Sequence, residues 1–68
     1  MIAPGTLVWV KKGMHTTYVD RPLDVRYVRV EQPAVALVVR QGGDRFIDRV
    51  VLLDGQLLVV DLRLLEVL

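Results

Sequence analysis

The chain contains no cysteine and a single histidine, His15, among its 68 residues. The lack of cysteine excludes disulfides and thiolate metal sites, and one imidazole is too few for a zinc site built from histidines. We therefore expect neither a metal nor a cofactor. A chain this short forms one domain, residues 1–68. Without disulfides or a metal, its stability must come from dense apolar packing or from association with another chain.

Long hydrophobic runs and an excess of one charge are also missing. The longest apolar run, residues 34–39, is far too short to cross a bilayer. The N-terminal sequence Met-Ile-Ala-Pro-Gly lacks the basic start and the long apolar segment of a secretory signal. Nine basic and eight acidic residues give a formal net charge of +1, which selects neither nucleic acid nor an anionic membrane. We expect no membrane partner and no small-molecule substrate.

Aromatic residues are few, but hydrophobic residues reach 53%, which favours both dense packing and association. They occur in short alternating stretches that are typical of strands, and no stretch predicts a helix of three turns. Residues 12–24 form a polar excursion in which only residues 16–19 favour a short strand. Asp61 can cap a single 3₁₀ turn before the last strand. The close spacing predicts an all-β barrel or small sandwich. The expected strands span residues 6–11, 24–31, 34–41, 45–53, 56–60 and 66–68.

The strongest turn signal is Asp54-Gly55, because both residues tolerate the positive φ of a tight hairpin turn. Four apolar residues lie on either side of it, so both faces of the predicted hairpin are apolar. One face must fill the interior, and the other is a candidate protein interface unless other parts of the monomer cover it. The two alternative sets are Val50, Leu52, Leu57 and Val59, or Val51, Leu53, Leu58 and Val60.

The two ends of the chain resemble a known fold. A Gly-x-Leu-Val-x-Val strand opens the chain, and an apolar hairpin, an Asp-led turn and Leu-Glu-Val close it. This pattern is similar to SH3-like barrels, in particular to short uncharacterised proteins of tailed bacteriophages. The resemblance implies a small SH3-like barrel of five to six short antiparallel strands with one 3₁₀ turn before the last strand. The matching residues are Gly5, Leu7, Val8, Val10, Val50, Asp54, Gly55, Val60, Leu65, Glu66 and Val67.

The polar residues give no catalytic constellation. His15 has no motif-linked nucleophile or carboxylate, so we expect a solvated loop histidine. Asp44 and Asp48 each neighbour an arginine, which indicates surface ion pairs rather than a catalytic carboxylate pair. The Gly42-Gly43 turn has no helix behind it and therefore does not predict a phosphate-binding loop. We expect the protein not to be an enzyme.

The aromatic residues indicate two different environments. We expect Trp9 in the core together with Leu7 on its strand face, since aromatic side chains supply much of the buried area in a small barrel. The two tyrosines instead lie among basic residues, and together they could bind and stack on a single-stranded nucleic acid. The alternative is a set of solubilising charges offset by nearby acidic residues. The candidate contact residues are Lys11, Lys12, Tyr18, Arg21, Arg26, Tyr27 and Arg29.

Two functional hypotheses follow. The first is a non-enzymatic structural protein that oligomerises or docks on a larger protein. The resemblance makes this concrete as a phage virion component, such as a capsid-decorating (cement) or connector protein, located in the virion or the host cytoplasm. The alternative is a small nucleic-acid-binding or transcription-modulating module that uses the region between Lys11 and Arg29.

Overall fold

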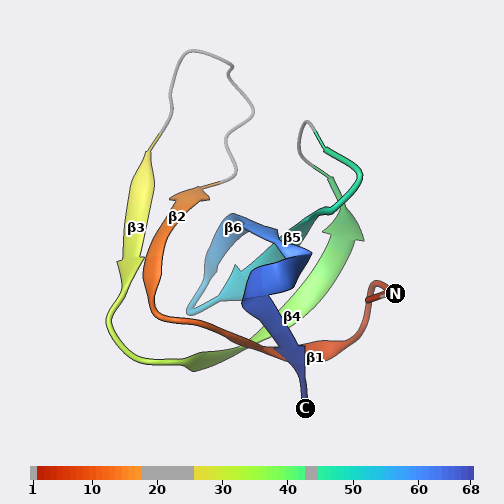
Figure 1. Cartoon of the computed structure of the whole chain (residues 1–68), viewed down its shortest axis with the longest axis horizontal. Helices are drawn as coiled ribbons and strands as arrows, with labels where there is room; N and C mark the ends of the chain where they lie inside the picture. Colours follow the sequence, from red (N-terminus) through yellow and green to blue (C-terminus); the bar gives the residue numbers. More distant parts are fainter. Residues whose placement is uncertain (1, 18–25, 43–44) are drawn as a thin grey trace.

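The computed structural model describes residues 2–17, 26–42 and 45–68 (Figure 1). These residues form β-strands and one 3₁₀ turn, η1, and the prediction of an all-β chain with a 3₁₀ turn before its last strand is confirmed. The elements are β1 (Leu7–Val10), β2 (Gly13–Thr17), β3 (Tyr27–Val30), β4 (Ala34–Gln41), β5 (Asp48–Leu53), β6 (Gln56–Asp61), η1 (Leu62–Leu64) and β7 (Leu65–Val67).

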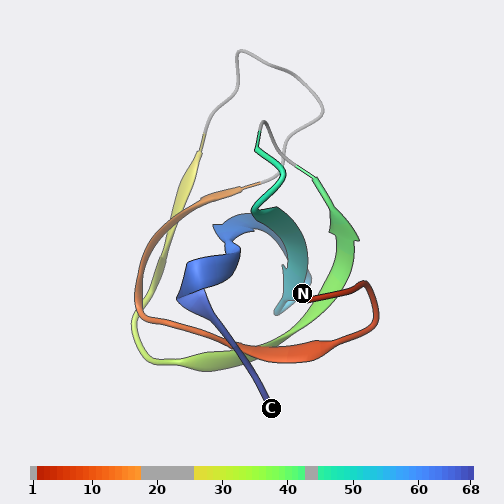
Figure 2. The same ribbon diagram turned by 45° about the vertical axis from the view of Figure 1, so that its right-hand side comes forward.

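The strands form one antiparallel sheet in the order β3-β2-β6-β5-β4-β1-β7. The sheet curls strongly, so that its strands wrap around a common interior (Figures 1 and 2). Among the described residues, β3 and β7 stand at the two ends of the sheet and do not pair with each other. The sheet therefore has seven strands rather than five to six, and it is not closed into the expected barrel.

The additional strand is β2, which lies in the stretch predicted to be a polar excursion. Its backbone pairs with β3 on one side, where Met14 lies opposite Arg29, and with β6 on the other, where Thr16 lies opposite Val59. The predicted short strand at residues 16–19 shares only positions 16 and 17 with β2, since 18 and 19 lie outside the described residues. Pairing on both sides makes β2 a strand, although its sequence lacks apolar alternation.

The hairpin predicted at Asp54-Gly55 is confirmed. Both residues have positive φ, 50° and 78°, as a two-residue type I′ turn requires. The turn sets the register of β5 and β6, with Val51 opposite Leu58 and Leu52 opposite Leu57. Directly opposed residues of an antiparallel pair point to the same side of the sheet, so this register also decides which side chains share a face.

Among the described residues the hydrophobic core cluster is aliphatic, and the prediction that Trp9 belongs to the core is wrong. Trp9 does share a face with Leu7, but this face points outwards, because Val8 and Val10 occupy the inner face of β1. The core residues are Val8, Val10, Val30, Ala36, Val38, Val51, Leu53, Leu58, Val60 and Leu65.

The C-terminal part of the chain folds largely as the sequence predicts. Asp61 caps η1, since its carboxylate accepts a hydrogen bond of 2.8 Å from the backbone N–H of Arg63. The turn redirects the chain so that β7 pairs with β1, with Leu65 opposite Val10. The last strand begins at Leu65, one residue before its predicted start.

Candidate functional site

The two faces of the β5–β6 hairpin differ in burial. Val51, Leu53, Leu58 and Val60 point inwards and belong to the core. The interface candidate that the structure leaves on the outside is therefore the other set, Val50, Leu52, Leu57 and Val59. Within it, Leu52 and Leu57 are 39% and 37% exposed, whereas Val59 is half-buried and Val50 is fully buried.

Val50 is covered by the monomer itself. The register between β4 and β5 shifts between Val38 and Arg40, so β4 carries an extra residue at Val39. Beyond it the backbone at Gly42 comes so close to Val50 that a Cβ there would lie 3.0 Å from Val50 Cγ2. Val50 is therefore covered by other parts of the monomer, which was the alternative to an interface.

Leu52 and Leu57 belong to a larger apolar surface. Leu52 lies opposite Leu37 on β4, and Leu37 lies opposite Leu7 on β1. Trp9 and Val35 form the next outward pair of these two strands. We call this surface the outer apolar patch, and its residues are Leu7, Trp9, Val35, Leu37, Leu52 and Leu57.

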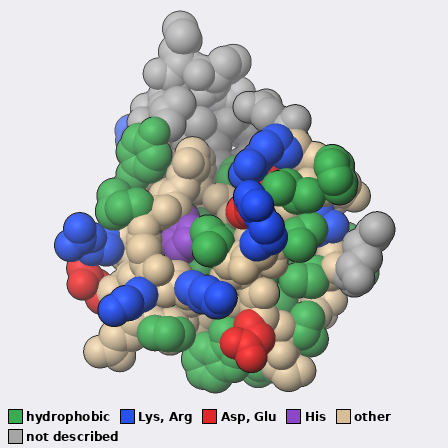
Figure 3. All heavy atoms as spheres, in the orientation of Figure 1, with side chains coloured by type: hydrophobic (Ala, Val, Ile, Leu, Met, Phe, Trp, Pro, Cys, Tyr) green, Lys and Arg blue, Asp and Glu red, His purple; other side chains and the backbone are tan. Residues whose placement is uncertain are grey.

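The outer apolar patch is accessible on the monomer. Its members on β1 and β4 include Leu7, Trp9 and Val35, which are exposed by 50%, 41% and 42%. A further exposed leucine, Leu68, lies next to the patch on the other side of β1. Its backbone N–H donates a hydrogen bond of 3.2 Å to the carbonyl of Leu7. In Figure 3, hydrophobic side chains gather over the lower right of the surface, where β1 and β4 run in Figure 1. Exposed apolar patches of this extent mark interaction sites.

The residues of the patch come from four strands, which explains why the hairpin alone indicated only part of it. Alternation in the sequence placed Leu7 with Trp9, and Val35 with Leu37, on common strand faces. It did not show that these faces point outwards or that they adjoin Leu52. The missing information is the register of three strand pairings, which aligns Leu7 with Leu57, 50 positions further along the chain.

Charged side chains border the patch. Glu66 lies opposite Trp9 where β7 pairs with β1, and Arg40 lies opposite Val50 where β4 pairs with β5. Both side chains are exposed. The two charges have opposite sign and lie at opposite ends of the patch, which we call the Glu66 flank and the Arg40 flank. The exposed Lys11 follows Val10 at the Glu66 flank.

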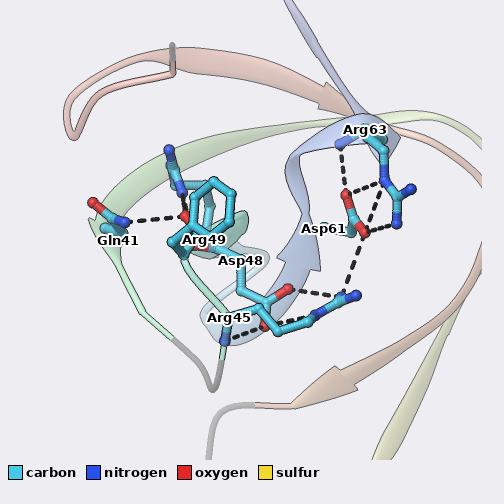
Figure 4. A network of polar contacts seen from close by, with 7 residues as sticks. Gln41, Arg45, Asp48, Arg49, Asp61 and Arg63 are labelled. Carbon is cyan, nitrogen blue, oxygen red and sulfur yellow. Dashed lines mark hydrogen bonds and ion pairs between the residues drawn. The ribbon is translucent and has the colours of Figure 1, made fainter.

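An ion-pair network holds the opposite end of the β5–β6 hairpin (Figure 4). Asp48 and Asp61 lie opposite each other across the two strands. Arg45 Nη2 lies 2.9 Å from Asp48 Oδ1 and 3.4 Å from Asp61 Oδ2, and Arg63 Nη2 lies 2.6 Å from Asp61 Oδ2. Asp48 forms an ion pair as expected, but its side chain is buried rather than at the surface, and Asp44 lies outside the described residues. Hydrogen bonds from Arg63 lower the pKa of Asp61 to about 2.

Arg49 is buried beside this network and was not expected to be. Its Nη1 donates to the carbonyls of Phe46 and Asp48, at 2.7 and 3.0 Å, and its Nε donates to the carbonyl of Ile2 at 2.9 Å. The guanidinium therefore ties the N-terminal segment to the turn before β5. Its partners are main-chain carbonyls rather than a ligand site, and we assign it a structural role.

The prediction of a solvated His15 is wrong, because this side chain is buried on the inner face of β2. Its Nε2 lies 2.9 Å from the carbonyl oxygen of Lys11. His15 lies opposite Val28, which packs against the core. The described residues contain no group of three or more His, Cys, Asp or Glu side chains that could hold a metal ion.

The candidate nucleic-acid residues are only partly brought together. Lys12 and Arg29 line one open cavity of about 350 Å³, together with Met14 and Glu31. Tyr27 lies on the same outward face of β3 as Arg29 and is exposed. The other described candidates, Lys11 and Arg26, are exposed at the ends of β1 and β3, and Tyr18 and Arg21 lie outside the described residues.

Comparison of the chain with protein-family models, with curated protein sequences and with solved structures finds no match. In the part of the chain that the structure describes, no helix has the length and apolarity needed to cross a membrane. Function therefore has to be inferred from the arrangement of the residues described above.

Proposed function

We propose that this chain is a non-enzymatic structural protein that binds another protein through the outer apolar patch. The observation that carries this proposal is the placement of the large apolar side chains. Trp9 and Leu7 on β1 and Leu52 on β5 lie exposed on the two sides of β4, while the core is built from valine, alanine and leucine. Tryptophan exposed within an apolar patch is the kind of residue that dominates binding energy at protein interfaces.

The energetics of the patch favour a bound state. Each aliphatic side chain that moves fully from water into an interface contributes about 1.5–3 kcal/mol. The patch side chains are only partly exposed, so each gains a fraction of this value. Six of them together still contribute several kcal/mol, which is large against the stability of a 68-residue domain, about 3–10 kcal/mol.

We further propose that the fold is an SH3-like barrel with an open seam and that the protein is a phage virion component. The resemblance of both chain ends to short tailed-phage proteins supports this. So do the pairing of the first strand with the last and the 3₁₀ turn between the apolar hairpin and that last strand. Within a virion, the patch would bind either a further copy of this chain or a capsid or connector subunit.

A photo-crosslinking amino acid at position 52 tests the proposed contact in the cell that expresses the chain. The matched control carries the same amino acid at Met14, which is also exposed on the outer side of the sheet but lies on β2, outside the patch. We expect adducts with protein from position 52 and far fewer from position 14. Equal yields of protein adducts from both positions, or no protein adduct from position 52, would contradict the proposal.

The alternative is binding of single-stranded nucleic acid by the Lys12 and Arg29 surface beside Tyr27. The specific support is that Lys12 and Arg29 line one cavity. Fluorescence anisotropy with single-stranded DNA and RNA oligonucleotides over a salt series tests it. Binding that weakens steeply with salt and is lost in the variant Lys12→Glu/Arg29→Glu would favour this alternative over the first proposal.

A further inference from the structure

We infer that the partner of the outer apolar patch is a second copy of this chain, in a weak symmetric dimer. The inference rests on the proposed function, because it names the partner of the same surface. The two copies contact each other through β4, whose outward residues Val35 and Leu37 lie at the middle of the patch. Leu7 and Trp9 lie on one side of this strand, and Leu52 lies on the other.

The distribution of charge favours self-association. The patch contains no charged residue, and a formal net charge of +1 gives two copies little mutual repulsion. A two-fold axis that runs between the two patches, over Leu37 and perpendicular to β4, sets the two β4 strands antiparallel. This arrangement places the flank with Glu66 on one copy against the flank with Arg40 on its partner. The apolar residues of the two patches then meet between the two places where the Glu66 flank of one copy lies over the Arg40 flank of the other.

The size of the patch sets the strength of the dimer. A standard interface takes about 800 Å² from each partner, which is about one sixth of the 4797 Å² surface of this chain. The outer side of the curled sheet is convex (Figures 1 and 2), so a second copy contacts only the strands nearest β4. The area buried is therefore below the standard value, and we expect a dissociation constant on the order of tens of micromolar.

Self-association also fits the small core. The chain has no cysteine, and the core formed by the described residues holds no aromatic side chain. Domains of this size without disulfides or metals commonly gain stability from association. A second copy supplies this wherever the chain is concentrated, since binding to the folded state raises apparent stability by mass action.

Sedimentation equilibrium of the purified chain from about 5 to about 500 µM tests the inference. We expect monomer at the lowest concentration and dimer at the highest. The variants Leu7→Glu and Leu52→Glu should weaken the dimer by more than ~100-fold, because each places a charge in the contact of both copies. Met14→Glu, a change at a similarly exposed residue outside the patch, should leave the association unchanged. Circular dichroism confirms that each variant is folded.

Two further readouts identify the surface. Trp9 is the sole tryptophan, so its fluorescence emission should shift to shorter wavelength as the dimer forms, and this shift should be absent in Leu52→Glu. The variant Leu37→Cys, in a chain that has no other cysteine, should form a disulfide-linked dimer on mild oxidation. Met14→Cys is the control and should remain monomeric.

The possible outcomes separate the inference from the proposed function. A chain that stays monomeric to about 500 µM overturns the dimer. If position 52 still crosslinks to a different protein, the proposed contact stands and only the identity of the partner is wrong. If position 52 gives no protein adduct, both fail. Association that Met14→Glu disrupts and Leu52→Glu does not would place the contact elsewhere and overturn the inference.

Discussion

Replacement of Leu58 by alanine tests the assignment of the two faces of the β5–β6 hairpin. Leu58 is completely buried on the inner face, whereas its neighbour Leu57 is 37% exposed on the outer face. The two residues have the same chemistry and adjacent positions on one strand. They therefore form a matched pair in which only the direction of the side chain differs.

The expected effects differ severalfold. A leucine-to-alanine change at a fully buried position costs about 2–5 kcal/mol, because apolar burial is lost and a cavity remains. A domain of 68 residues has a total stability of about 3–10 kcal/mol, so Leu58→Ala removes a large part of it. Leu57→Ala leaves no internal cavity and removes only partial burial, which we expect to cost about 1 kcal/mol or less.

Urea unfolding followed by far-UV circular dichroism measures both values. The protein concentration should lie below the range in which the chain self-associates, since dimer formation would add to the apparent stability of the wild type. A shift of one residue in the strand register would move every side chain to the opposite face. If Leu57→Ala proves as costly as Leu58→Ala, or costlier, the assignment of the core face is wrong.

Three further predictions concern the turn, the ion-pair network and the buried arginine. Gly55→Ala should lower the free energy of unfolding by roughly 1 kcal/mol, because φ at this residue is 78°. A Cβ at this position would meet no atom within 4 Å, so the cost comes from the backbone conformation alone. Unchanged urea unfolding would argue against the I′ turn. The pKa of Asp61 lies at about 2 in the folded chain against an ordinary 3.8, so its contribution to stability is present above pH 3.8 and is lost as pH falls toward 2. Unfolding measured across this pH range should show this loss in the wild type and a smaller loss in Asp61→Asn. Arg49→Met should destabilise the chain by about 1–3 kcal/mol, since it leaves the carbonyls of Ile2, Phe46 and Asp48 without this donor. An unchanged free energy of unfolding in urea would show that these hydrogen bonds do not contribute to stability.

Features that depend on neighbouring residues could be predicted from the sequence. The turn at Asp54-Gly55 follows from the backbone freedom of those two residues, and η1 follows from the capping carboxylate of Asp61. The alternation that placed Leu7 and Trp9 on one face also holds. These features follow from local backbone geometry, which a few residues determine.

Features that depend on distant pairing could not be predicted. Whether Trp9 points inwards is decided by how β1 packs against the rest of the curled sheet, and its own sequence does not contain that information. His15 is buried because β2 pairs with β3 and β6, although its surroundings in the sequence are polar. The outer apolar patch exists because three registers align Leu57, Leu52, Leu37 and Leu7, so only its hairpin members were predicted.

Photo-crosslinking from position 52, with position 14 as control, tests most directly whether the outer apolar patch is a protein-binding surface. We expect adducts of defined mass that contain protein and that form from position 52, with little product from position 14. A chain that is folded and expressed but yields no protein adduct from position 52 would show that the patch is solvent-exposed in the cell, and the proposed contact would be wrong.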